Sequence, residues 1–346
     1  MDSNPKKKLS SPEYLPIVFF VAALLYFGRT LFIPMFYGLL IAIVLYPICK
    51  WLERHKWPRS MAITLGLSIV IILFAMLVTL LVLEINAFRG DLPELRAKLE
   101  PSLQQWQLWI ESNFNISIDA QNEWWKRTTS ALSDNTGVML KGTANTFFIL
   151  FLVPVFTALF LYSRGSFVRF LEKMAGDKYG NPLHAILQST VHTYFNFIKG
   201  MIMVYIIVGT LNSIGLLILG IKHAILFGFL TAIMTIIPYI GIFVSALLPI
   251  SVAWLTKDSI WYPIGVVAVF AFVQYLEANV IFPRVVASQL QVSTWATLVA
   301  IIVGGILWGV SGMILFIPFV GILKIVTDNI TEWKPLNILL DRGNMK

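Results

Sequence analysis

Residues 224–256 read AILFGFLTAIMTIIPYIGIFVSALLPISVAWLT and contain no charged side chain. A straight helix of this length would measure about 50 Å, whereas the hydrocarbon core of a typical bilayer is about 30 Å thick. Pro238 and Gly241, within the sequence IPYIG, interrupt the run near its middle. The stretch is too long for one ordinary membrane span, and it predicts a helix that breaks and turns back inside the membrane.

A second stretch, residues 294–323, has the same character. It also lacks charge and carries IPFVG at residues 317–321. Its helix-breaking residues are Gly304, Gly305, Gly309, Gly312 and Pro318. Backbone groups freed by such breaks are tolerated at membrane depth only where protein or a water-filled cavity satisfies them. We therefore expect two re-entrant helical hairpins, and the alternative is a pair of long, kinked spans.

The composition places most of the chain in a membrane. Of its 346 residues, 58% are hydrophobic and 13% are charged, whereas soluble domains are about 45–50% apolar and about 25% charged. The apolar runs do not alternate as barrel strands would. The expected fold class is an all-α polytopic membrane protein with about six full spans and two hairpins, or with eight spans under the alternative. The predicted spans are residues 14–28, 31–49, 61–87, 143–163, 201–221 and 260–283, with a tight turn between the first two.

The basic residues orient these segments. Lys and Arg gather in the cytoplasmic loops of membrane proteins. Most of the 26 in this chain fall on one side of the membrane when both termini are placed in the cytoplasm. The short external turns then hold only Arg29, Lys222 and Lys257. The net charge of +8 thus indicates topology and gives no reason to expect nucleic acid as a partner.

Two polar stretches lie between the spans. Residues 164–200 are expected to form an amphipathic helix on the cytoplasmic surface, and residues 88–141 an external helical insert. The insert carries large side chains every three or four residues, namely Leu92, Leu95, Leu99, Leu103, Trp106 and Ile110, with a kink expected at Pro101. A piece of this size seldom builds its own core. We expect it to pack against copies of itself in a homo-oligomer, the alternative being that it leans on the membrane surface.

The predicted organisation therefore has six parts. Residues 1–87 hold the N-terminal tail and three spans, 88–141 the insert, and 142–163 the fourth span. Residues 164–200 hold the surface helix, 201–327 a transport core with both hairpins, and 328–346 a cytoplasmic tail.

Motifs of pumps and hydrolases are missing from the sequence. It has no Gly-Lys-Ser/Thr phosphate loop, no Gly-x-Ser-x-Gly and no His-Glu-x-x-His. His184 and His192 lie eight residues apart, which is a poor spacing for metal ligands on one helix. The single cysteine, Cys49, excludes an intramolecular disulfide. We expect neither an enzyme nor a bound metal or cofactor.

One carboxylate lies within membrane-buried sequence. Residues 277–284, EANVIFPR, place Glu277, Asn279 and Arg284 at the end of the span 260–283. An acidic side chain inside a membrane helix is costly and by default marks a functional site. We expect Glu277 to bind substrate or a coupling ion; the alternatives are a structural tie to a neighbouring helix and a side chain that reaches the interface. Asn279 shares the site only if the helix unwinds before Pro283, because two residues turn a regular helix by about 200°.

Three stretches, residues 32–65, 218–250 and 276–326, together resemble the autoinducer-2 exporter family of bacterial and archaeal membrane transporters. The resemblance covers about residues 14–326. The family's motif positions fall on Glu277, Asn279, Pro283, Pro238, Gly241, Gly304, Gly305, Gly309, Gly312 and Pro318. The chain departs from the pattern at Ala287, where many relatives have glycine, and at Ser293, where they have proline. These departures leave the identity of the substrate open.

The resemblance implies a multi-pass protein of the bacterial cytoplasmic membrane that exports a small molecule. The substrate is a quorum-sensing signal in some members and sodium or protons in others. The expected function is a secondary transporter for a small molecule or ion, with cation or proton coupling. A passive channel-like oligomer and a non-transporting scaffold in the bilayer are the alternatives.

Overall fold

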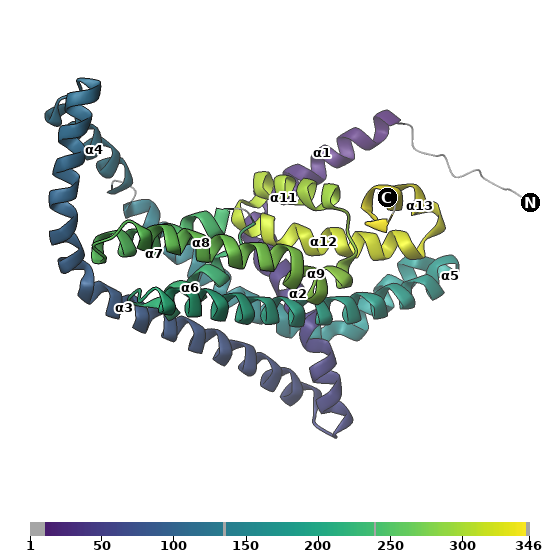
Figure 1. The fold of residues 1–346 in the computed structure, drawn as a ribbon. Coiled ribbons are helices and arrows are strands. Elements are labelled where there is room, and N and C mark those ends of the chain that lie inside the picture. The colour runs from purple at the N-terminus through teal and green to yellow at the C-terminus, as the bar shows by residue number, and fades with distance from the viewer. Residues whose placement is uncertain (1–10, 134–135, 239, 344–346) are drawn as a thin grey trace, which may run out of the picture. The chain divides into compact units, whose positions relative to one another are not determined.

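The computed structural model describes residues 11–133, 136–238 and 240–343, and helices make up nearly all of these ranges (Figure 1). In chain order the helices are α1 (Ser11–Phe27), α2 (Arg29–Arg54), α3 (Arg59–Phe114), α4 (Ile118–Ser133), α5 (Thr136–Ile218), α6 (Ala224–Met234), α7 (Ile240–Thr256), α8 (Trp261–Leu276), the π-helix η1 (Glu277–Ile281), α9 (Phe282–Val285), α10 (Ala287–Leu290), α11 (Thr294–Trp308), α12 (Val310–Asn329), the short 3₁₀-helix η2 (Thr331–Trp333) and α13 (Lys334–Leu340). No strand forms in the described ranges, apart from a single bridge between Val292 and Asp341.

Six helices in the described ranges are long and apolar enough to cross a membrane. They are Arg29–Arg54, Arg59–Thr79, Phe148–Gly176, Pro182–Ile218, Trp261–Val285 and Val310–Asn329. The predicted all-α polytopic class is confirmed. The six helices differ from the six predicted spans in one member. α1 is not among them, and α12, the second arm of the second predicted hairpin, takes its place.

The tight turn predicted after the first span is a kink. At Gly28 the backbone keeps its helical hydrogen bonds on both sides, from Gly28 N to Leu24 O at 2.8 Å and from Phe32 N to Gly28 O at 3.0 Å. A chain that reversed here would lose this i to i−4 pattern. Figure 1 shows α2 continuing at an angle from α1. The reversal used to place the N-terminus in the cytoplasm is therefore absent.

The first long uncharged stretch breaks at Pro238, as predicted, and the second breaks at Gly309, whereas Pro318 and the sequence IPFVG lie inside α12 without ending it. The first becomes α6 and α7, and the second becomes α11 and α12, with the two helices of each pair packed against each other. The 11 residues of α6 give a helix of about 16 Å, which is too short to cross a bilayer core of about 30 Å. The chain therefore turns back at both breaks. Re-entry of these hairpins into the membrane stays a prediction.

Two helices are longer than the sequence suggested. α5 comprises two helices joined across a kink at Gly176, where the backbone is non-helical with φ 63°. Residues 182–218 form one helix, so the predicted surface helix and the fifth span are continuous. α3 runs through Pro93 and Pro101 without restarting. A proline removes one backbone hydrogen bond and bends a helix, and in both cases the helix continues beyond the bend.

The chain divides into two compact units that alternate along the sequence. One contains the residues up to Pro47, Ile149–Val191 and the residues from Gln291 onward, and the other contains Ile48–Phe148 and His192–Leu290. In the first, Ile33, Trp308 and Leu315 form a buried cluster where α2 meets α11 and α12. In the second, buried Leu216, Phe227 and Val266 join α5, α6 and α8. Each hairpin thus packs within its own unit.

Candidate functional site

Glu277 lies at the start of the π-helix that follows α8. The N–H of Phe282 donates to the carbonyl of Glu277, five residues back, in place of the usual four. Pro283 has no N–H, so the carbonyl of Asn279 has no regular helical donor at this point. Single wide turns of this kind are frequent at functional sites. The helix widens before Pro283 and does not unwind, so the condition under which Asn279 would share the site is not met.

The carboxylate of Glu277 is half-buried and incompletely bonded. Its Oε2 is buried and has no hydrogen-bond partner among the described residues. Gln274 Oε1, one turn earlier on α8, is also buried and without a partner there. Asn212 on α5 is only 2% exposed, and its Oδ1 has none either. Three buried oxygen acceptors therefore lack donors inside one unit.

Packing between α5 and α8 brings these three side chains to neighbouring levels. A Cβ at Gly200 would lie 2.7 Å from Val285 O, and one at Gly215 would overlap the side chain of Val269, so the helices run antiparallel. Gln274 and Glu277, three residues apart, share one face of the helix. They therefore fall opposite the part of α5 between Tyr205 and Asn212. Tyr205 is close enough to Glu277 to interact with it electrostatically.

The other two polar residues of the stretch 277–284 do not join Glu277. Asn279 is exposed and donates from Nδ2 to Tyr275 O of its own helix at 2.9 Å. Arg284 is exposed, and within the described ranges no ion pair joins it to Glu277. Sequence reasoning missed Gln274 and Asn212, although a polar residue three positions before an intramembrane glutamate is a signal that could have found Gln274.

At the break of the first hairpin, Gly241 rather than Pro238 makes the critical contact. Pro238 is half-buried in the turn between α6 and α7. A Cβ at Gly241 would overlap the carbonyl oxygen of Met234, the last residue of α6. Only glycine lets the two arms approach this closely.

The second hairpin has the same construction with more glycines. Gly304 and Gly312 face each other across α11 and α12, and a Cβ on either would overlap the backbone of the other. Gly305 faces the flexible end of Met313. Gly309 forms the turn with φ 60° and ψ −139°, a conformation that favours glycine. Pro318 is buried within α12.

Aromatic residues hold the turn of this hairpin. Trp308 Nε1, just before Gly309, donates to Leu25 O of α1 at 2.9 Å. Tyr37 of α2 is hydrogen-bonded to Ser311, just after the turn. The rings of Phe36 and Phe319 meet edge to face, with centroids 4.8 Å apart. The predicted glycines therefore pack the arms together, and residues of α1 and α2 fix the turn.

Helices broken by glycine and proline, a carboxylate on a long apolar helix and six helices able to span a bilayer are features typical of membrane transporters. The chain belongs to the AI-2E transporter family, whose model matches residues 15–332. YueF of Bacillus subtilis is 26% identical over 326 residues, covering 88% of this chain and 86% of YueF. YhhT of Escherichia coli K12 is 25% identical and TqsA of the same strain is 23% identical, each alignment covering at least 87% of both chains. TqsA is named as an AI-2 transport protein, whereas YueF and YhhT are named provisionally as transport proteins without a stated substrate.

Proposed function

We propose that this protein is a secondary transporter that exports a small molecule or ion across the bacterial cytoplasmic membrane, and that a coupling cation or proton binds at Glu277. The observation that carries the proposal is the buried Oε2 of Glu277, which lacks a donor and lies on the same helix face as the unpartnered Oε1 of Gln274. An unpaired buried carboxylate is strongly destabilising, so it requires either a proton or a cation.

The chemistry of the three orphaned groups suits such a ligand. Carboxylate and amide oxygens are the ligands that hard cations prefer. In the proposed site Glu277 supplies the charge, while Gln274 and Asn212 supply neutral oxygens. Asn279 and Arg284 are left out of it, because their side chains are exposed and do not contact Glu277.

We assign the hairpin residues a second role in transport. Broken helices let secondary transporters present backbone dipoles to substrate and coupling ion. In this proposal Pro238 and Gly241 shape the break of the first hairpin. Gly309 forms the break of the second hairpin, and Gly304, Gly305, Gly312 and Pro318 lie within the two helices that flank it.

Flux measurements in proteoliposomes test the transport mechanism. With purified protein, substrate flux is expected to rise when a sodium or proton gradient is imposed and to fall to a low level when the gradient is collapsed. Flux that is equal with and without a gradient would indicate a passive channel. The relative TqsA makes AI-2 the first substrate to test. Absence of flux across a panel of small molecules and cations would favour a scaffold.

The insert is proposed to drive homo-oligomer formation. Gln107 Nε2 donates to Asn122 Oδ1 at 2.9 Å and ties α3 to α4. Trp106, Trp109, Trp124 and Trp125 remain between 51% and 65% exposed in the single chain. The side chains of Leu92, Leu95 and Leu99 lie outside the described residues. We expect a multi-chain particle in detergent by light scattering, and a particle with the mass of one chain would contradict the proposal.

The C-terminus is proposed to lie in the cytoplasm. Basic residues surround the connection between α2 and α3, and under the positive-inside rule they favour a cytoplasmic position for it: Lys50 and Arg54 at the end of α2, Lys56 in the connection and Arg59 at the start of α3. Single cysteines introduced at Lys257 and Arg284 should react with an impermeant reagent from outside and from the cytoplasm, respectively. The reverse pattern would indicate that the uncharged stretches are ordinary spans.

A further inference from the structure

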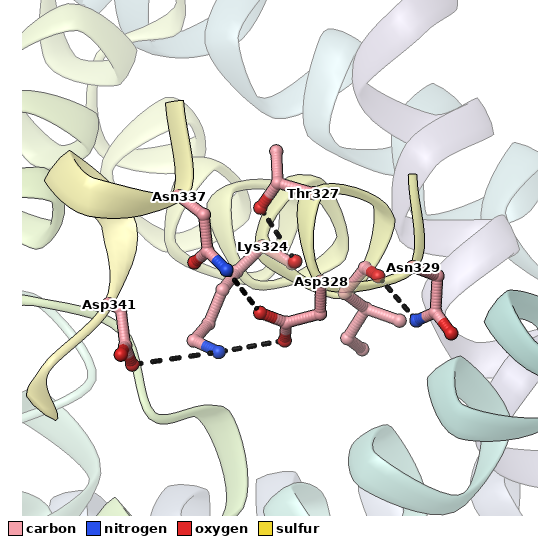
Figure 2. Close-up of polar contacts among 7 residues, drawn as sticks. Lys324, Thr327, Asp328, Asn329, Asn337 and Asp341 are labelled. Carbon is pink, nitrogen blue, oxygen red and sulfur yellow. Dashed lines mark hydrogen bonds and ion pairs between the residues drawn. The ribbon is translucent and has the colours of Figure 1, made fainter. Parts of the chain in front are cut away.

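A cluster of charges around the buried Lys324 closes the end of the second hairpin away from its turn. Lys324, near the end of α12, is only 5% exposed. Its Nζ lies 2.7 Å from Asp328 Oδ2, one turn on, and 3.7 Å from Asp341 Oδ1, beyond α13 (Figure 2). Asn337 Nδ2, from the middle of α13, donates to the other oxygen of Asp328 at 2.8 Å. The C-terminal helix is therefore tied to the end of α12 by polar contacts at two points.

The same C-terminal segment is also bonded to the start of α11. Ser293 N donates to Leu340 O at 2.7 Å, and Arg342 N donates to Gln291 O at 3.2 Å. The hydroxyl of Ser293 donates to Leu339 O at 2.7 Å and accepts from Ala296 N at 3.2 Å. The Ser293 side chain is fully buried. One hydroxyl thus caps α11 and fastens the C-terminal segment to it.

These contacts join the two arms of the hairpin at their open end. The arms meet at Gly309 at one end, and at the other the segment 334–343 binds both Ser293, before α11, and Asp328, in the last turn of α12. A hairpin fixed at both ends resists separation or sliding of its arms. Withdrawing the segment would take Asp341 away from the buried ammonium of Lys324, which would keep only Asp328 of its own helix as an acidic partner among the described residues.

We propose that residues 334–343 form a C-terminal clamp that holds the arms of the α11–α12 hairpin together and restrains its movement. Release of the clamp loosens both arms at once. The structural part of the proposal stands by itself, and the effect of the clamp on flux rests on the proposed transport function.

Ser293→Pro isolates the clamp. The backbone of Ser293, at φ −64° and ψ 150°, already has the geometry of proline. Val292 forms a β-bridge with Asp341 and is therefore extended. An extended conformation is the one favoured for a residue that precedes proline. The substitution removes both the N–H and the hydroxyl that bind the C-terminal segment. Thr294→Pro is the matched control, because Thr294 is exposed at the first position of α11, where proline is favoured.

Hydrogen exchange on the purified protein provides the readout. In Ser293→Pro we expect faster exchange at residues 340–342 and also at residues 326–330, on the opposite arm. Each lost hydrogen bond shifts the opening equilibrium by a factor of roughly two to ten. Exchange that rises at 340–342 alone would overturn the proposal, because the segment would then be a tail bound to α11 only. Unchanged exchange at both places would overturn it as well.

Asn337→Ala provides a second variant that leaves Ser293 intact. It removes the hydrogen bond between α13 and Asp328, and faster exchange at residues 326–330 is again expected, to a smaller degree than in Ser293→Pro. In proteoliposomes, Ser293→Pro should raise flux in the absence of a gradient severalfold above that of Thr294→Pro. If the parent transports and Ser293→Pro shows the same flux as Thr294→Pro, the clamp does not restrain a movement of the α11–α12 hairpin that transport needs. Absence of flux from the parent would count against the transport function, while the exchange data would still decide the clamp.

Discussion

Glu277→Gln should fold and assemble as the parent does, yet lose gradient-driven flux by at least about tenfold, the change that 1.4 kcal/mol of lost cation affinity produces. Glutamine keeps the size of the side chain and one oxygen acceptor but removes the charge. The orphaned Oε2 indicates that no donor within the described residues depends on that oxygen, so the fold has little reason to change. Flux in proteoliposomes and the melting temperature in detergent measure the two effects separately.

Asp258→Asn is the matched control for this substitution. Asp258 lies in the same unit, in the short connection between α7 and α8, and its side chain is exposed. Removing this carboxylate should leave both flux and melting temperature at the parental values. If Glu277→Gln transports like the parent at every pH, Glu277 is a structural tie. The coupling site would then be sought at the breaks around Pro238 and Gly309.

Gly312→Ala is expected to destabilise the fold itself. The added Cβ would overlap the carbonyl of Gly304 in the facing arm, and backbone atoms cannot step aside as a side chain can. Overpacking of this kind typically costs about 1–3 kcal/mol. We expect a clearly lower melting temperature in detergent and a smaller yield of monodisperse protein.

Gly305→Ala is its control in the same hairpin. A Cβ at Gly305 would meet only the terminal methyl of Met313, at 2.9 Å, and that side chain can change rotamer. It should therefore melt close to the parent. If Gly312→Ala were as stable as Gly305→Ala, the two arms would not be in contact at their glycines, and the packing described for α11 and α12 would be wrong.

The hairpins were predictable because length and composition act together. An uncharged stretch too long for a bilayer, with Pro238 and Gly241 or Gly309 and Pro318 inside it, has few conformations that keep its backbone hydrogen-bonded. The glycines at 241, 304 and 312 follow from the same cause, since two helices joined by a short turn must approach closely. The first break falls at Pro238 and the second at Gly309, but Pro318 does not break the helix as expected, because it lies inside α12.

The kink at Gly28 and the length of α5 were not predictable in the same way. Gly28, Arg29 and Pro34 read as a turn, but helical hydrogen bonds continue across them. Residues 164–200 carry polar side chains that suggested a separate surface helix, yet the helix that contains residues 182–200 runs on through Gly200, Gly209 and Gly215 to Ile218. Side-chain polarity changes where a helix leaves the membrane, whereas the helical conformation continues until a cap or a helix-breaking residue ends it.

The partners within the site and the clamp depend on distant contacts. Glu277 was found from its own charge, whereas Asn212 is proposed as its partner because α5 and α8 pack antiparallel. Ser293 and Leu339 are 46 positions apart in sequence, and their bond follows from the path of α12 and α13. Residues 328–346 had been expected only as a tail, since nothing local in them signals the segment they bind.

The wide turn at Glu277–Ile281 also has a mechanical property. It holds one residue more than the regular turns beside it, and that surplus can pass along the helix as the amide of one residue exchanges one carbonyl for the next. Each such step rotates the side chain it passes by about 100°, the angle between successive residues of an α-helix. Glu277 sits at the first position of the turn. Movement of the wide turn past Glu277 would therefore rotate its carboxylate about the helix axis into a different environment. Only local backbone hydrogen bonds would exchange, and the span would not unfold.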